Sequence, residues 1–414
     1  MNRGFLKKLG PGFLLAGAAI GVSHLVQATR AGANYGIIML IAIIVACVSK
    51  YPFLAVGAQF PALTKKDLIQ GYKNLGKWYV ISFGVFTLGS MFIILAAVTL
   101  VTAGLAEYLF NFGWSNFWWC TFILGLCLLI LQFGSYSKLD VLLKIVISLL
   151  TIATTIAVFI AIVEHEASTV NFNTTSLWSI SGLSFLVVLM GWMPIPIDAS
   201  VWQSIWIKEK EKSLKTSASE SFMDFNLGYF SASFLGILFF LLGVLIMYGE
   251  GIKFSSNAVE FSKQLIELYS QTLGSWSKHL IAGIALITMF STTLTVADAY
   301  PRVLSRLQAV SSKSTKISNS NFYNLYMTLL IISSLCLLYF LKSSFKTLVD
   351  FAAGLSFISS PVLAWFNYKL VLKSSVDQLK PSKPYRYFMQ ICLTVLIVIA
   401  LSYIILLIFI PNIL

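Results

Sequence analysis

Two short interruptions in apolar segments carry the side chains that could do chemistry in this chain. The first interruption (GVSH) contains Ser23 and His24, and the second (GWMPIP) contains Met193 and is followed by Asp198. Imidazole and thioether groups suit softer transition metals, and a carboxylate offsets part of the charge of a bound cation. His24, Met193 and Asp198 are therefore candidate metal ligands.

The same interruptions also suit an organic substrate. Gly21 and Ser23 leave backbone groups and space free at the first interruption. A helix that restarts after a break presents unpaired N–H groups and the positive end of its dipole, which favour a carboxylate on a bound solute. We therefore expect Gly21, Ser23, His24, Met193 and Asp198 to bind either a metal ion or a small organic solute.

Two further carboxylates could belong to a permeation or coupling path. Asp298 precedes Pro301 and Arg302, so a helix-end ion pair with Arg302 is the alternative role for this acid. Asp350 opens an apolar segment rich in small residues, where an acid could also cap a helix N-terminus. The sequence leaves both roles open at both positions.

The segments that position these residues belong to a membrane protein. Of 414 residues, 58% are hydrophobic and 11% are charged, whereas soluble proteins carry roughly 25% charged residues. The apolar runs are long enough to cross a hydrocarbon core about 30 Å thick, so we expect an all-α polytopic protein. We expect about eleven spans, near residues 10–30, 36–57, 79–108, 116–133, 140–163, 182–206, 225–249, 279–300, 322–341, 346–369 and 387–410.

The interruptions fall in the first and sixth expected spans. In lipid, an unwound stretch survives only where it lines a cavity or a buried site, and paired breaks in two halves of a chain indicate a transporter. We therefore expect one domain over residues 1–414, made of two inverted five-helix repeats (about 10–163 and 182–369) and an extra helix at about 387–410. This is the arrangement of LeuT-type secondary transporters.

The charge pattern predicts an orientation. The net charge is +13, and most Lys and Arg residues fall on one side of the expected spans. By the positive-inside rule, the N-terminus is cytoplasmic and the C-terminus lies outside, in what we expect to be a bacterial plasma membrane. The same rule accounts for the basic charge without a nucleic-acid partner. The five cysteines form no CxxC pair, and no cofactor is expected.

One stretch of the chain resembles a known family. Residues 9–14 (LGPGFL), residues 18–20 (AAI) and residues 27–36 (QATRAGANYG) resemble the first helix of NRAMP divalent-metal transporters and its exit. Met193-Pro194 resembles the start of the family's Met-Pro-His break. The resemblance implies a LeuT fold and inward transport of Mn²⁺ or Fe²⁺ with protons.

The chain departs from the family at the metal site. Gly21 stands where the family has its metal-binding Asp, His24 stands where it has Asn, and Ile195 stands where it has His. Met193 is the one side-chain ligand that remains. The third span also lacks the family's acidic residues for proton transfer between Met91 and Ala103.

These features predict a secondary transporter of the NRAMP type, working by alternating access. The expected substrate is a divalent metal cation bound at a non-standard site, and the alternative is a small organic solute such as an amino acid. The expected partners are that substrate and the lipid bilayer, and a monomer is plausible. Because no nucleotide-binding or hydrolase motif is present, we do not expect an enzyme.

Overall fold

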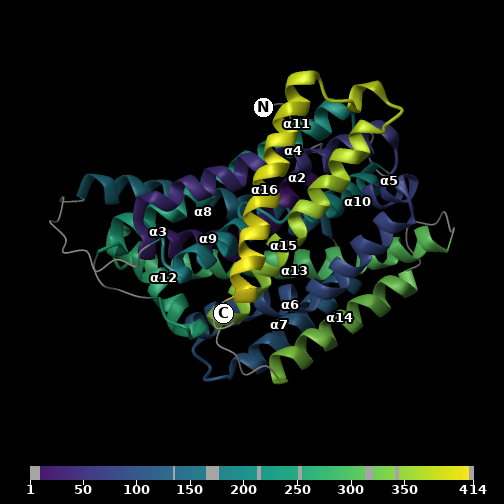
Figure 1. Ribbon diagram of the computed structural model, residues 1–414. Coiled ribbons are helices and arrows are strands. Elements are labelled where there is room, and N and C mark those ends of the chain that lie inside the picture. Colours follow the sequence, from purple (N-terminus) through teal and green to yellow (C-terminus); the bar gives the residue numbers. More distant parts are fainter. Residues whose placement is uncertain are drawn as a thin grey trace.

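The computed structural model describes residues 10–133, 136–164, 177–211, 216–249, 254–312, 320–340 and 345–409, and all its described secondary-structure elements are helices (Figure 1). In chain order they are α2 (Pro11–Ala19), the π-helix η1 (Ser23–Ala28), α3 (Thr29–Tyr35), the 3-10 helix η2 (Gly36–Ile38), α4 (Met39–Thr64), α5 (Leu68–Leu75), α6 (Lys77–Phe110), α7 (Asn116–Phe133), α8 (Tyr136–Glu164), α9 (Ile180–Trp192), α10 (Ala199–Glu211), α11 (Ala218–Leu242), the π-helix η3 (Gly243–Met247), α12 (Ala258–Leu273), α13 (Ser277–Ser311), α14 (Ser320–Phe340), α15 (Phe345–Leu372), the 3-10 helix η4 (Asp377–Leu379) and α16 (Lys383–Phe409).

The helices have the length and composition of membrane spans. Within the described ranges, seven helices are long and apolar enough to cross a bilayer, and three shorter apolar helices accompany them. Each of the eleven expected spans corresponds to one, two or three consecutive helices. Large apolar side chains such as Ile41, Phe230 and Ile405 are exposed at the periphery, where lipid rather than water is the surrounding medium.

The first expected break is present. Helix α2 ends at Ala19, and the chain becomes helical again at Val22 as the π-helix η1. Gly21 is required here because a Cβ at this position would lie 2.6 Å from Oγ1 of Thr292 on α13. Short π-helical segments occur frequently at functional sites, so the π-helix after this break supports a functional role for it.

The second expected break lies between α9 and α10. Helix α9 ends at Trp192, and α10 begins at Ala199. Pro194 and Pro196 lie between them and have no N–H group with which to continue a helix. The Met193–Pro194 peptide bond is cis.

Both halves of the first broken helix pack tightly on the continuous helix formed by α11 and η3. Near the start of α11, a Cβ at Gly12 or at Gly228 would collide with the backbone of the other helix. At the far end, a Cβ at Gly32 would collide with the α11 backbone, and one at Gly243 would collide with the backbone of α3. Such small residues allow helix backbones to approach closely in membranes.

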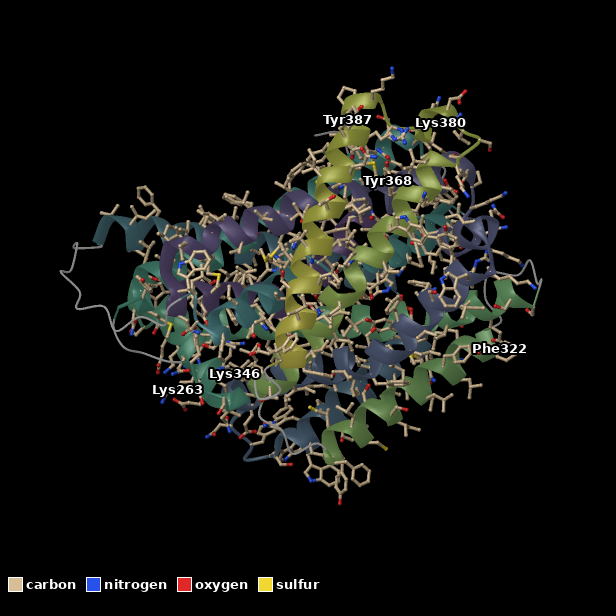
Figure 2. All side chains as sticks on the ribbon, viewed as in Figure 1. Lys263, Phe322, Lys346, Tyr368, Lys380 and Tyr387 are labelled. Atoms are coloured by element: carbon tan, nitrogen blue, oxygen red, sulfur yellow. The ribbon has the colours of Figure 1, made fainter. Side chains whose placement is uncertain are left out.

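The broken halves separate toward two sides of the molecule. In Figure 1, α3 and α9 lie toward the left with α12, whereas α5 and α10 lie toward the right. Figure 2 shows Lys263 and Lys346 at the lower left and Lys380 at the upper right. From their places between the expected spans, Lys263 and Lys346 are expected outside and Lys380 inside, and the first two lie far from the third in this view.

The predicted amphipathic segment at residues 257–273 is also a helix, α12. Its first turn is capped by Asn257, whose Oδ1 accepts hydrogen bonds from the N–H groups of Val259 and Glu260. Phe261 and Leu265 are buried in its contact with the rest of the molecule. The helix therefore covers one side of the bundle.

Candidate substrate site at the two helix breaks

A small cavity of about 30 Å³ lies where the two breaks meet. Both breaks, α6, α10 and α13 contribute to its wall. The lining residues are Ala18, Ala19, Val22, Ser23, Ile94, Val98, Trp192, Pro194, Ile195, Pro196, Trp202, Thr292 and Val296.

The lining is apolar and contains two indole rings. Trp192 is fixed by a hydrogen bond from its Nε1 to Ser356 Oγ at 2.9 Å, and Trp202 meets the Tyr300 ring edge to face, with centroids 5.2 Å apart. Ser23 and Thr292 supply hydroxyl groups. Among the described lining residues there is no carboxylate, imidazole or thioether.

Ser23 and His24 form a buried hydrogen-bonded pair beside the cavity. Ser23 Oγ lies 2.6 Å from His24 Nδ1 and donates to the Ala19 carbonyl at 2.7 Å. His24 Nε2 donates to the Ala232 carbonyl of α11 at 2.8 Å. Both ring nitrogens of His24 are therefore used inside the protein, and the side chain is fully buried. Only Ser23 of this pair reaches the cavity.

The structure brings Met193 and His24 close together. Both lie against Gly236 of α11, where an added Cβ would collide with Met193 Cε and would come within 3.3 Å of His24 Cδ2. The lack of a side chain at Gly236 makes room for the thioether. The two side chains are thus neighbours behind the cavity wall.

Asp198 lies in a different environment from the other two candidate ligands. Its Oδ2 accepts a hydrogen bond from Tyr300 of α13 at 3.4 Å, and it does not line the cavity. Across the part of the chain that the structure describes, no group of three or more His, Cys, Asp or Glu side chains could hold a metal ion. The metal site of His24, Met193 and Asp198 therefore remains a prediction, and only the shared position of His24 and Met193 beside Gly236 supports it.

Asp298 makes the ion pair that its sequence position allowed. Its Oδ2 lies 2.7 Å from Arg302 Nε and accepts from Trp206 Nε1 at 3.4 Å, while Oδ1 accepts from Tyr323 at 2.6 Å. The carboxylate joins α10, α13 and α14 at the end of α10 that leads away from the cavity. Its role in a pathway stays a prediction.

Asp350 of α15 links this helix to η1 and α3, the second half of the first broken helix. Arg30 of α3 donates to its two oxygens at 2.7 and 3.0 Å, and Gln27 donates to Oδ1 at 3.0 Å. The Arg30 guanidinium also lies 4.8 Å from the ring centroid of Phe185 on α9. Asp350 lies within α15 rather than at its first residue, so the pair with Arg30, and not a helix cap, describes its contacts.

The residue that sequence reasoning missed is Lys50 of α4. Its Nζ is fully buried and donates to the carbonyls of Gly191, Met193 and Ile195 at 2.8, 3.1 and 3.3 Å. The sequence feature that could have identified it is a single lysine within an apolar span. Ionisable residues at such positions are expensive and usually functional.

These features define a class of protein. A polytopic helical membrane protein with two broken helices around a buried cavity has the architecture of a secondary transporter. Solved structures support this fold over the whole chain. The Eremococcus coleocola manganese transporter, in complex with an aromatic bis-isothiourea compound, is similar with a TM-score of 0.69 at 14% identity, covering 100% of this chain and 90% of that chain. Mhp1, a nucleobase-cation-symport-1 family transporter with bromovinylhydantoin bound, has a TM-score of 0.60 at 12% identity, covering 97% and 90%.

The chain belongs to the natural resistance-associated macrophage protein-like (Nramp) family, whose profile matches residues 12–408. A relative from Pasteurella multocida (strain Pm70), named uncharacterized protein PM0681, is 35% identical over 369 residues, covering 88% of this chain and 85% of the relative. The predicted family and the LeuT-type fold are confirmed. The protein is an integral membrane transporter of this family and not an enzyme.

Proposed function

We propose that this protein transports a small organic solute through the cavity between its two helix breaks. The observation that carries the proposal is the lining of that cavity, which combines two indole rings, two prolines and aliphatic groups. Its volume of about 30 Å³ is far below the roughly 300–1,000 Å³ typical of small-molecule sites, so the cavity must widen to admit a solute, as an alternating-access cycle requires. A compact solute with an apolar body fits such a wall.

The polar groups at the cavity favour an anionic or polar head on that solute. The half-helix that restarts at Val22 begins at the cavity wall, so the positive end of its dipole favours a negative charge there. Ser23 and Thr292 supply hydroxyl groups at the same wall. We infer a small carboxylate-bearing solute, for which an amino acid is the simplest example.

A divalent cation is supported less well by the same geometry. Such ions need oxygen ligands, usually including carboxylates, and the described lining residues offer none. Carbonyls exposed by the second break could replace them, but Lys50 already binds three of these carbonyls. A metal ion would have to compete with an internal cation.

Metal transport is nevertheless the second candidate because two observations favour it. The fold resembles that of a manganese transporter, and the Met193 thioether lies beside His24. A softer transition metal could bind there after His24 gives up one of its hydrogen bonds. This route predicts that metal binding depends on both side chains.

Transport would proceed by alternating access, with the N-terminus in the cytoplasm as the distribution of basic residues predicts. In that orientation, α3 and α9 lead outward from the cavity and α2 and α10 lead inward. The Arg30–Asp350 pair then closes the outward side, and the contacts of Asp298 fasten α10 on the inward side.

A binding screen tests both candidates on one sample. Purified full-length protein is examined by thermal shift and calorimetry with amino acids and small monocarboxylates, and in parallel with Mn²⁺, Fe²⁺ and Zn²⁺. We expect an organic hit that is lost in Val98→Trp, which fills the cavity, and retained in Val85→Trp. Val85 lies on the same helix but is 63% exposed, so it controls for the bulk of tryptophan. The milder Val98→Leu is the fallback if Val98→Trp does not fold.

The alternative outcome is equally specific. Saturable binding of a metal ion that disappears in both His24→Ala and Met193→Ala, with no organic hit, would establish the second candidate and refute the first.

A further inference from the structure

A second pocket, of about 540 Å³, lies beside the ends of α4 and α15. It shares no lining residue with the cavity at the helix breaks, and its size falls within the roughly 300–1,000 Å³ typical of small-molecule sites. In Figure 1, α5 and the segment that follows α15 lie at the upper right. The lining residues are Phe60, Leu63, Thr64, Lys66, Asn74, Leu75, Leu370, Lys373, Ser374, Ser375 and Val376.

The wall of this pocket combines apolar side chains with two lysines. Leu63 and Leu75 are among the aliphatic groups, and Lys66 and Lys373 supply the charge. Among the described lining residues there is no carboxylate to balance that charge. A concave surface with one sign of charge concentrates ligands of the opposite sign, so the pocket suits an anion.

The donors of the pocket are available to a ligand. Lys66 and Lys373 are both exposed, and within the described part of the chain neither forms an ion pair. Asp377, which follows the pocket residue Val376, already contacts Lys380 at 2.8 Å. These two ammonium groups can therefore bind an anion without breaking an internal pair.

A hydroxyl group stands beside the second lysine. Ser374 Oγ accepts a hydrogen bond from the N–H of Val376 at 3.1 Å, which fixes the turn after α15. A hydroxyl that accepts one hydrogen bond still has its own proton to donate. Ammonium and hydroxyl donors together suit the oxygens of a phosphate, because hydrogen bonds to ionised groups are the strong ones.

Aromatic side chains place the pocket near a membrane surface. Trp78 is 70% exposed, and Trp365 stacks on Tyr79 with ring centroids 5.5 Å apart. Lys369, which precedes the pocket residue Leu370, has its Nζ 5.7 Å from the centroid of the Trp365 ring. Tryptophan and tyrosine are enriched where a bilayer meets water, so lipid headgroups lie at the level of this pocket.

We propose that this pocket binds the phosphate headgroup of an anionic phospholipid. Lys66 and Lys373 bind the phosphate, Ser374 donates to one of its oxygens, and the aliphatic wall receives the start of the acyl chains. Basic pockets between membrane helices on the cytoplasmic side bind such headgroups, and this lysine-rich side is the one predicted to be cytoplasmic. A lipid held by both lysines links the connection between α4 and α5 to the segment after α15.

A lipid titration of the full-length protein tests the proposal. Protein freed of lipid by detergent exchange is titrated with phosphatidylglycerol in mixed micelles, and the melting temperature is followed. We expect a saturable rise that zwitterionic phosphatidylcholine does not produce. Lys66→Gln together with Lys373→Gln should weaken the apparent affinity about 25-fold, roughly fivefold for each lysine.

A second double variant controls for general attraction between a basic surface and anionic lipid. Lys77 and Lys383 are exposed, lie at the starts of α6 and α16, and do not line the pocket. Lys77→Gln together with Lys383→Gln removes the same charge and should bind phosphatidylglycerol like the wild type. Equal weakening in both double variants, or unchanged affinity in the pocket variant, would overturn the proposal. If the pocket variant does not fold, its two single substitutions are compared with the two single controls.

Soluble anions distinguish a lipid from a free phosphate. Inorganic phosphate and glycerol phosphate carry the charge but have no acyl chains for Leu63 and Leu75 to contact. We expect neither to raise the melting temperature as phosphatidylglycerol does at the same phosphate concentration. An equal rise with glycerol phosphate would show that the pocket takes a soluble phosphate ester and is not a lipid site. None of these measurements depends on which solute the protein transports.

Discussion

The ion pair between Arg30 and Asp350 gives the sharpest prediction about the working cycle. The two side chains are only 4% and 16% exposed, and the contact is bidentate. Removing one partner of a buried pair costs about 3–5 kcal/mol because the other charge stays buried and unpaired. The partial exposure of Asp350 places Asp350→Ala at the lower end, at about 3 kcal/mol.

This free-energy penalty destabilises the state in which Arg30 of α3 and Asp350 of α15 are in contact. If α3 moves away from α15 on opening, water solvates Arg30 and the open state does not carry the penalty. An energy difference of about 3 kcal/mol then shifts the equilibrium toward the open state by roughly 100-fold. Asp350→Ala should therefore make the cavity accessible from the side of α3.

Thiol labelling measures this accessibility. Val22, which lines the cavity, is replaced by cysteine in a Cys336→Ser background, since Cys336 is the exposed one of the five free thiols. A membrane-impermeant thiol reagent is applied to cells or to oriented vesicles. We expect the labelling rate to rise by up to roughly 100-fold in Asp350→Ala.

The control removes an ion pair of the same type from an exposed position. Asp377 contacts Lys380 at 2.8 Å, but its side chain is 90% exposed, and exposed pairs contribute little. Asp377→Ala should leave the labelling rate unchanged. Equal labelling rates in Asp350→Ala and the parent protein would show that the Arg30–Asp350 pair does not close this side.

Three further substitutions have defined outcomes. Gly21→Ala should lower the melting temperature through overpacking against Thr292, at a cost of about 1–3 kcal/mol, and Thr292→Ala in the same chain should recover part of that loss because it removes the colliding atoms. Trp202→Ala should enlarge the cavity and shift the thermal-shift response toward bulkier solutes. Asp67→Asn should destabilise the protein by about 3–5 kcal/mol, because its partner Arg306 is 5% exposed and would lose its counter-charge.

Each of these has a contradicting result in the same assay. Additive losses in the Gly21→Ala and Thr292→Ala double variant would mean that the two residues do not collide. An unchanged solute preference in Trp202→Ala would remove this indole from the selectivity determinants. A melting temperature of Asp67→Asn within error of the wild type would show that water already reaches the pair with Arg306.

Sequence patterns predicted the fold well because membrane constraints are simple. Long apolar runs had to be helices, and an unwound stretch such as residues 193–196 had to face a buried site. The prediction could not go further because contacts between distant segments decide the site. Nothing near Gly21 in sequence indicates that its missing side chain makes room for Thr292 on α13.

The site shows the same limit more clearly. His24 and Met193 lie near each other in the structure, but Gly236, the residue that both of them face, lies more than 40 residues beyond Met193 in the chain. Lys50 was overlooked because a lysine within a span is ordinarily read as an orientation signal or as a tolerated charge. Only its three distant carbonyl partners show what it does.

The glycine contacts of α11 and η3 have a mechanical consequence. The continuous helix formed by α11 and η3 packs closely on α2 through Gly12 and Gly228, and on α3 through Gly32 and Gly243. The two halves of the first broken helix, α2 and α3, therefore cannot rotate independently. Any change in the angle between them requires the continuous helix formed by α11 and η3 to bend. Because the contact with α3 lies at Gly243, where α11 passes into the π-helix η3, a change of angle between α2 and α3 must be accommodated at this junction or elsewhere along α11.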